Sequence, residues 1–231
     1  MPKFLYMDGF GNDANTISLL DFVGADGSTT FTDIAAGASR TWTAFGNAQI
    51  DTAIQMAGLP TGLFDGTGDY ITTPDSADLA FGLGPFTFDF RIKRAETGTA
   101  QHNVFGHANA GLTGGYHLGF IKPTTSVFEF GMNDQTKNAS TATGITNTNE
   151  HHIAVVRDGN NLGAALDGVW GTLVDVTGIT YTDSPGAFAW GRGGDFATGS
   201  LHNGSLGQCR ISNIARWTPG VNFTPPAGPY S

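Results

Sequence analysis

Four aspartates stand close together in the stretch FDGTGDYITTPDSADLAFG, which covers residues 64–82. They are Asp65, Asp69, Asp75 and Asp78, set among glycine, threonine and aromatic residues. Loops rich in aspartate supply the oxygen atoms that bind calcium or sugars. The same Asp-Gly pairs also form tight turns, because aspartate bonds its own backbone and glycine accepts a positive φ. The residue types alone leave both interpretations open.

A second loop offers ligands of the type that calcium requires. Calcium takes six to eight oxygen ligands, which loops supply through carboxylate, amide and backbone carbonyl groups. The segment GADGSTTFTD contains two such carboxylates, Asp26 and Asp33. We name these two residues as candidate ligands of a calcium ion.

Sugar binding calls for exposed aromatic rings beside polar loop residues, since a ring face packs on the C–H face of a sugar. Trp170, directly after the turn LDGV, is the best candidate, with Tyr116 and Asp195 in other loops. The alternative for Trp170 is packing over the next strand. Trp190 and Trp217 look like strand residues that fill the core.

The residues for catalysis lack the necessary spacing. A glycosidase needs two carboxyl groups roughly 5–10 Å apart, but Glu129 and Asp89 each stand without a neighbouring acidic partner. Adjacent His151 and His152 would point to opposite faces of a strand. Cys209, in GQCRIS, is expected to be a small buried hydrophobic residue. We therefore expect a protein that is not an enzyme, without catalytic residues and without a cofactor other than the candidate calcium ion.

Composition and charge restrict the class of partner. The 231 residues carry a formal net charge of −9, and only 13% of them are charged. An acidic, lysine-poor surface repels phosphate groups, so we expect neither nucleic acid nor an anionic membrane as a partner. The apolar runs are far shorter than the roughly 20 residues that span a bilayer.

Period-two patterns predict strands along most of the chain. In PFTFDFRIK, residues 85–93, apolar and polar side chains alternate, which predicts a strand with one buried and one wet face. SVFEFGM repeats the pattern, whereas HHIAVVR, residues 151–157, suits a central strand that is buried on both faces. Asp-Gly and Asn-Gly turns separate the runs. The chain is therefore predicted to be all-β, with two antiparallel sheets packed as a sandwich.

The chain ends differ from the middle. We predict an N-terminal arm over residues 1–17, one sandwich domain over 18–217, and a proline-rich C-terminal arm over 218–231. Both arms are candidates for docking on a neighbour, although tails that pack across their own sheet are commoner. No secretory signal is recognisable in MPKFLYMDGFGND, and a single cysteine forms no intramolecular disulfide. These features predict folding in a reducing cytosol.

Several segments, in this order, resemble the laminin G-like branch of the concanavalin A-like jelly rolls, particularly the versions common in virion proteins of tailed phages. They are DFVGADGSTTFTD (21–33), GNAQIDTA (46–53), GLFDGTGDYITTPDSADLAFGLGPFTFDFRIK (62–93), EHHIAVVRDGNNLGAALDGV (150–169) and LGQCRISNIARWTPGVNFTPP (206–226). The resemblance implies a two-sheet antiparallel jelly-roll sandwich with its termini close together.

The resemblance also bears on the acidic loops. It implies that FDGTGDY is a hairpin turn and that PDSADLAFG is a turn before the next strand, so turn residues are favoured for Asp65, Asp69, Asp75 and Asp78. Relatives often carry calcium near the GADGS loop, but their IDE segment in the last strand is replaced here by Gly207 and Gln208. That loss of carboxylates weakens the case for calcium.

The function expected from these features is a non-enzymatic structural protein of a bacteriophage virion, at the capsid or tail surface. It would assemble in the host cytoplasm, act through interfaces with other virion proteins, and associate with copies of itself. The alternative is a carbohydrate-binding adhesin that recognises a host glycan.

Overall fold

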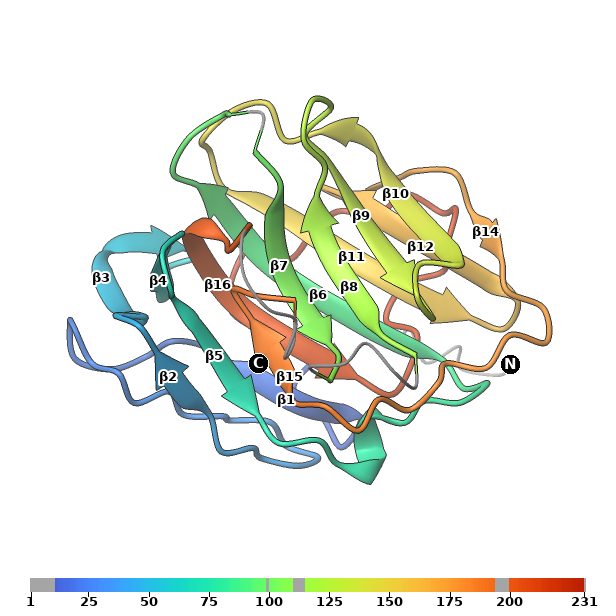
Figure 1. Cartoon of the computed structure of the whole chain (residues 1–231), viewed down its shortest axis with the longest axis horizontal. Helices are drawn as coiled ribbons and strands as arrows, with labels where there is room; N and C mark the ends of the chain where they lie inside the picture. Colours follow the sequence, from blue (N-terminus) through green and yellow to red (C-terminus); the bar gives the residue numbers. More distant parts are fainter. Residues whose placement is uncertain (1–10, 99, 110–114, 194–199, 231) are drawn as a thin grey trace, which may run out of the picture.

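The computed structural model describes residues 11–98, 100–109, 115–193 and 200–230. Two antiparallel sheets lie face to face in these ranges (Figure 1). The prediction of an all-β, two-sheet jelly-roll sandwich is therefore confirmed.

The larger sheet has nine strands. Seven follow one another in the spatial order β13 (Val169–Trp170), β12 (Asn161–Leu166), β11 (His151–Asp158), β6 (Phe86–Arg94), β16 (Asn203–Ser212), β4 (Leu59–Asp65) and β3 (Gln49–Met56). In addition, β1 (Thr16–Leu20) pairs with β16, and β14 (Val174–Asp175) pairs with β12.

The second sheet has seven strands. Their spatial order is β10 (Lys137–Gly144), β9 (Val127–Met132), β8 (His117–Ile121), β7 (His102–His107), β15 (Phe188–Trp190), β5 (Tyr70–Thr73) and β2 (Thr43–Phe45). One 3-10 turn, η1 (Ala77–Leu79), follows β5. Within the described ranges, no helix has the length and apolar character needed to cross a membrane.

Aromatic side chains fill the space between the sheets. Phe88 and Phe90 of β6 point inward and meet rings of the other sheet: Phe88 packs on Phe105 at 5.1 Å between ring centres, and Phe90 on Trp190 at 5.4 Å. Each of these phenylalanines is fully buried, and burial of one such side chain contributes about 2–3 kcal/mol. The alternation in the sequence therefore identifies the inner face correctly.

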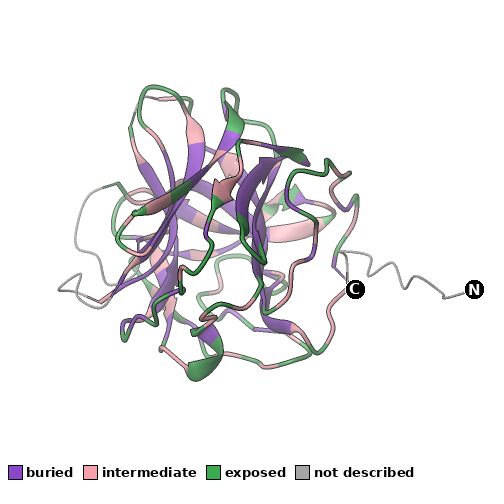
Figure 2. Ribbon diagram, turned by 90° about the vertical axis from the view of Figure 1, so that its right-hand side faces the viewer, coloured by how far each residue is buried: buried purple, intermediate pink, exposed green. Residues whose placement is uncertain are grey.

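The outer face of β6 is also buried, contrary to the prediction of a wet face. Thr87 and Asp89 are fully buried and Arg91 is 6% exposed. Strands β6 and β11 are buried along nearly their whole length, and Figure 2 shows buried residues running through the strands of the sandwich. The cover comes from the end of the chain, because the backbone carbonyl of Pro226 accepts a hydrogen bond from the Arg91 guanidinium.

The C-terminal segment packs across its own sheet, which is the commoner arrangement for such a tail; docking of residues 218–231 on a neighbour stays a prediction. Phe223 stacks on Trp217 with 4.5 Å between ring centres, and the Tyr230 hydroxyl lies 3.2 Å from His152 Nε2. Ala154 and Val156 of β11 form a second apolar cluster beneath these rings. An outward-facing apolar stripe on β11 needs this cover.

A buried ion pair lies under the same cover. Arg210 of β16 contacts both carboxylate oxygens of Asp89, at 2.9 and 3.0 Å, and neither side chain is exposed. Burial alone would raise the pKa of Asp89, but Arg210 and His152 outweigh it and lower that pKa to about 2. The Tyr230 ring lies 4.0 Å from the guanidinium, and Gly11 accepts a hydrogen bond from it. The first and last parts of the described chain thus meet on Arg210.

The predicted N-terminal boundary falls inside a strand. β1 begins at Thr16, and Asp13 already belongs to the folded domain through an ion pair with Arg216 at 2.8 Å. The remainder of the predicted arm, residues 1–10, lies outside the described residues.

The turn FDGTGDY connects the two sheets and is not a hairpin. It leaves β4 of the nine-stranded sheet and enters β5 of the seven-stranded sheet. Asp69 is buried and accepts hydrogen bonds from the backbone N–H groups of Asn47 and Asp65, at 2.7 and 2.9 Å. Gly46 has a φ of +67°, and a Cβ there would collide with the Asp69 carboxylate. Asp69 is therefore a turn residue, as the sequence favours.

The buried ion pair generates a prediction about stability. Arg210→Met leaves Asp89 buried without its main cation, and we expect the free energy of unfolding to fall by about 3–5 kcal/mol. The double variant Asp89→Leu, Arg210→Met removes both charges and should recover most of the loss. Urea unfolding of the three proteins measures both effects. A double variant as unstable as Arg210→Met would mean that the hydrogen bond of Arg210 to Gly11, and not charge pairing, stabilises this region.

Candidate functional site

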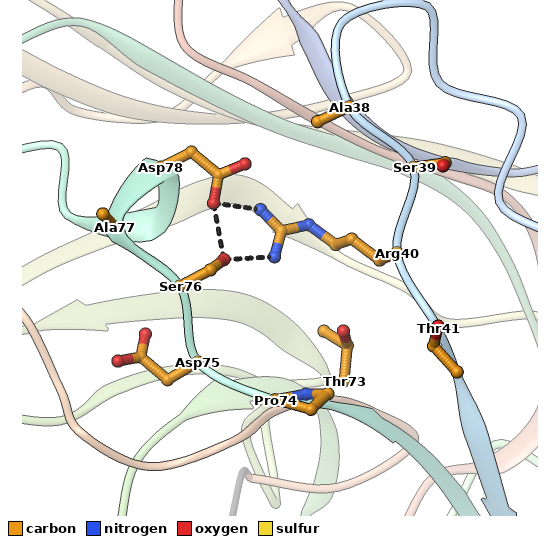
Figure 3. A pocket seen from close by; sticks show the side chains of 10 residues that line it. All are labelled: Ala38, Ser39, Arg40, Thr41, Thr73, Pro74, Asp75, Ser76, Ala77 and Asp78. Atoms are coloured by element: carbon orange, nitrogen blue, oxygen red, sulfur yellow. Dashed lines mark hydrogen bonds and ion pairs between the residues drawn. The ribbon is translucent and has the colours of Figure 1, made fainter.

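A pocket of about 480 Å³ opens beyond the paired ends of β2 and β5. Residues 38–41, which lead into β2, form one side, and residues 73–78, which follow β5, form the other (Figure 3). Pro74 ends β5 at this point, since proline cannot donate to the ladder. The chain then turns into η1 and presents Asp75, Ser76 and Asp78.

One side of the pocket is fixed by Arg40. Its guanidinium lies 2.7 Å from the Asp78 carboxylate and donates to the Ser76 hydroxyl at 2.7 Å (Figure 3). Its Nε donates to the backbone carbonyl of Ile17. Burial would raise the pKa of Asp78, but hydrogen bonds from Ser76 and Arg40 keep it below its usual 3.8. Asp78 therefore stays ionised at neutral pH, which makes it an acceptor of hydrogen bonds and a poor proton donor.

The remaining lining combines a few hydroxyl groups with the apolar side chains of Ala38, Pro74 and Ala77. Ser39, Thr41 and Thr73 contribute hydroxyl groups, and Asp75 contributes a second carboxylate. A small-ligand site usually has a concave surface on which a small number of polar groups converge. Donors and acceptors of this kind match a ligand that carries many hydroxyl groups.

An exposed aromatic pair lies on the same two strands. Phe45 and Tyr70 stand opposite each other in the β2–β5 ladder and stack with 4.5 Å between ring centres. Phe45 is 40% exposed, and the Arg192 guanidinium lies 4.5 Å from the Tyr70 ring centre. Thr41, just before β2, is exposed like Thr43 and Phe45, whereas Trp42 between them is buried, so Thr41 and Phe45 belong to the same outward face. The pocket and the aromatic pair thus occupy two ends of one surface, which we call the β2–β5 edge.

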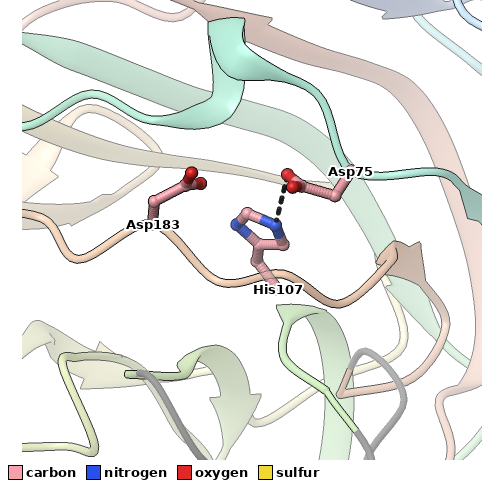
Figure 4. A group of neighbouring side chains, drawn as sticks. All are labelled: Asp75, His107 and Asp183. Carbon is pink, nitrogen blue, oxygen red and sulfur yellow. Dashed lines mark hydrogen bonds and ion pairs between the residues drawn. The ribbon is translucent and has the colours of Figure 1, made fainter.

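A histidine between two carboxylates lies close by (Figure 4). His107 ends β7, Asp75 follows β5, and Asp183 precedes β15; one ligand atom from each lies within 4.8 Å of the others. His107 Nε2 is 3.2 Å from Asp75 Oδ1. Burial lowers the pKa of His107, and this effect outweighs the opposing influence of Asp75 and Asp183. The imidazole is therefore neutral at pH 7.

Trp170 does not fulfil the prediction of an exposed sugar-stacking residue. It is only 8% exposed, its Nε1 donates to the backbone carbonyl of Val221 at 2.8 Å, and its ring packs against Phe223. The alternative named from the sequence, packing over the next strand, was right about burial, but the cover of Trp170 comes from the C-terminal segment.

The sequence also predicts Tyr116 and Asp195 as sugar ligands. Tyr116 precedes β8 and is half-buried, with its hydroxyl accepting a hydrogen bond from Gln135 at 3.1 Å. Asp195 lies outside the described residues.

The two predicted calcium ligands, Asp26 and Asp33, accept hydrogen bonds from other residues of the domain. Both oxygens of Asp33 are engaged: Oδ2 accepts from the Ser18 hydroxyl and from Trp42 Nε1, and Oδ1 accepts from two backbone N–H groups. Asp26 is exposed and accepts from the N–H and hydroxyl of Thr52. Within the described part of the chain, neither belongs to a cluster of potential metal ligands. The structure therefore gives the predicted calcium site no support.

The candidate catalytic carboxylates are separated by the fold. Asp89 is paired with Arg210 in the nine-stranded sheet, whereas Glu129 lies in the seven-stranded sheet with Lys122 at 2.8 Å. Cys209 is fully buried, which raises the pKa of its thiol well above the usual value. None of these three residues stands in the β2–β5 edge.

The sequence offers Asp75 and Asp78 as possible ligands and favours turns for them, but it did not reveal the other residues of the β2–β5 edge. Arg40 and Phe45 carry no motif, and His107 is 32 residues from Asp75 along the chain. Strand pairing brings distant residues together here. His107 lies opposite Phe188 in the β7–β15 ladder, so the segment before β15, which contains Asp183, lies beside His107.

A family model described as the concanavalin A-like lectin/glucanases superfamily matches residues 65–220. Among curated proteins, none matches this chain. The match covers the turn between the sheets, strands β5 to β16 and the start of the C-terminal segment.

Solved structures with the same fold include three binding domains or modules. The binding domain of Paraclostridial Mosquitocidal Protein 1 has a TM-score of 0.65 at 12% identity, with 87% of this chain and 49% of that one covered. The binding domain of botulinum neurotoxin serotype D has a TM-score of 0.64 at 12% identity, with 90% and 50% covered. This chain thus spans about half the length of each.

The third structure is of similar size to this chain. Domain 4 of AbnA, an extracellular arabinanase from Geobacillus stearothermophilus, was solved in complex with arabinotriose. It has a TM-score of 0.58 at 17% identity, with 87% of this chain and 93% of that one covered. At such identities the three likenesses show the fold alone.

Proposed function

The chain belongs to the concanavalin A-like lectin/glucanases superfamily, and from this premise we propose that it is a non-catalytic module that binds a carbohydrate at the β2–β5 edge. The observation that carries the proposal is the continuity of a pocket that contains hydroxyl and carboxylate groups with an exposed aromatic pair on one face. Sugars present both hydroxyl groups and apolar C–H faces, and this surface offers a partner for each.

The dimensions of the surface suit a short oligosaccharide. Thr41 and Phe45 are four residues apart, which is about 13 Å in a chain that rises roughly 3.3 Å per residue. One sugar unit would occupy the pocket and accept or donate hydrogen bonds there, while a later unit would lie on the Phe45 ring. Arg40 is held by Ile17 and Asp78 before any ligand arrives, so its ordering costs nothing on binding.

Solved structures support the binding role and not a catalytic one. Two of them are toxin binding domains, and the third holds arabinotriose. Hydrolysis would need one carboxyl group that keeps its proton near neutral pH. Asp78 and Asp89 have pKa values below the usual one. Both stay ionised and cannot act as that acid.

Titration calorimetry with arabinotriose, after a glycan array to find the preferred sugar, tests the proposal. We expect Phe45→Ala to weaken binding by roughly tenfold, since an aromatic contact contributes about 1 kcal/mol or slightly more. Thr41→Val removes one hydroxyl without changing shape and should weaken binding less. Trp170→Phe is the matched aromatic control and should bind like the unmodified protein.

Two outcomes would contradict the proposal. One is an array and a titration that show no binding to any glycan. The other is binding that Trp170→Phe abolishes and Phe45→Ala leaves unchanged, because the sugar would then sit at the opposite sheet. Circular dichroism of each variant verifies that it is folded.

We propose as a second role that the module is a surface component of a bacteriophage virion, assembled in the host cytoplasm with other virion proteins or with copies of itself. The resemblance of residues 21–33, 46–53, 62–93, 150–169 and 206–226 to such proteins supports this role. It is compatible with glycan binding, since a particle surface is where a host glycan would be met.

Deletion of residues 1–10 tests this second role without cutting β1 or the Asp13–Arg216 ion pair. We expect less of the truncated chain in purified particles, measured by mass spectrometry. Absence of the full-length chain from particles would contradict the role, and equal incorporation of the truncated chain would contradict docking through the N-terminal arm.

A further inference from the structure

Asp75, His107 and Asp183 bring an imidazole and two carboxylates to one point of the rim of the sandwich. One ligand atom from each lies within 4.8 Å of the other two. The three residues come from three separate segments, namely the loop after β5, the last position of β7 and the segment before β15 (Figure 4). We propose that this cluster binds a divalent transition-metal ion of the zinc type.

The measured separation fits coordination of a single ion. Two ligand atoms that each lie about 2.1 Å from an ion are roughly 3.0–3.4 Å apart at octahedral or tetrahedral angles. His107 Nε2 and Asp75 Oδ1 are 3.2 Å apart. They are joined by a hydrogen bond (Figure 4), and an ion that displaces the shared proton would find them at the spacing of neighbouring ligands.

The third ligand has the freedom to complete the site. Asp183 is exposed, so rotation of its side chain meets little resistance. His107 is 1% exposed and is held by its ladder neighbours Phe188 and His117. A fixed imidazole with one adjustable carboxylate is a preorganised site that tolerates small differences in ion size.

The two carboxylates of the cluster carry negative charge, which favours the binding of a cation. Two carboxylates, Asp75 and Asp183, stand beside a single imidazole at this point. Within the described ranges, no lysine or arginine forms an ion pair with Asp75 or Asp183. Arg40, which lines the same pocket as Asp75, is paired with Asp78 instead.

The ligand types select the class of ion. Imidazole and carboxylate together suit zinc and other first-row transition ions, whereas calcium and magnesium prefer oxygen ligands alone. Three protein ligands at an exposed rim leave at least one position for water. The inference stands on this geometry and does not depend on glycan binding.

Calorimetric titration of the full chain with zinc chloride tests the proposal. We expect one ion per chain, and Asp183→Asn and Asp75→Asn should each weaken binding by roughly tenfold or more. Asp183 is exposed, so its variant should fold normally, which circular dichroism checks. The matched control is Asp167→Asn, because Asp167 pairs with His151 at 2.7 Å without a second carboxylate; it should bind zinc like the unmodified protein.

A second measurement locates the ion spectroscopically. Cobalt in place of zinc should give visible absorption bands that Asp183→Asn removes and Asp167→Asn retains. The proposal would be overturned by the absence of zinc binding at millimolar concentration, by binding that persists in both Asp75→Asn and Asp183→Asn, or by a preference for calcium over zinc.

Discussion

A layer of aromatic side chains packs between the two sheets and fixes their position relative to each other. The positions of the strand ends, and of the loops that follow them, depend on this packing. Phe105 of the seven-stranded sheet contacts Phe88 of the nine-stranded sheet and Phe188 of its own, at 5.1 and 5.9 Å between ring centres. Interiors packed this closely do not deform gradually. The ends of β5, β7 and β15 are therefore fixed, and with them the loops that carry Asp75, His107 and Asp183.

The outer surfaces of the two sheets differ in how far the chain itself covers them. On the nine-stranded sheet, groups that resemble a functional site in the sequence, such as Asp89, His152 and Trp170, are covered by the C-terminal segment and stabilise the fold. At the β2–β5 edge, Thr41, Thr43 and Phe45 stay exposed. Polar groups buried by the chain itself must satisfy one another, whereas those left at an edge are available to a ligand.

Much of the fold was predictable and most of the site was not. Alternation of phenylalanine along residues 86–92 is a local pattern, and it identifies the inner face of β6 correctly. The outer face was misjudged because its cover, Phe223 and Tyr230, lies more than a hundred residues away in the sequence. The same limit applies to His107 and Asp183, which strand pairing brings together. Asp69 was recognisable as a turn residue, but the sheet to which the turn leads was not.

The location of the ligand is the central claim, and chemical-shift mapping measures it directly. Backbone amide shifts of the isotopically labelled protein would be followed during titration with the glycan selected on the array. The account predicts shifts concentrated in residues 38–45 and 70–78, with residues 166–171 unaffected. Shifts centred on Trp170 and the C-terminal segment would contradict it.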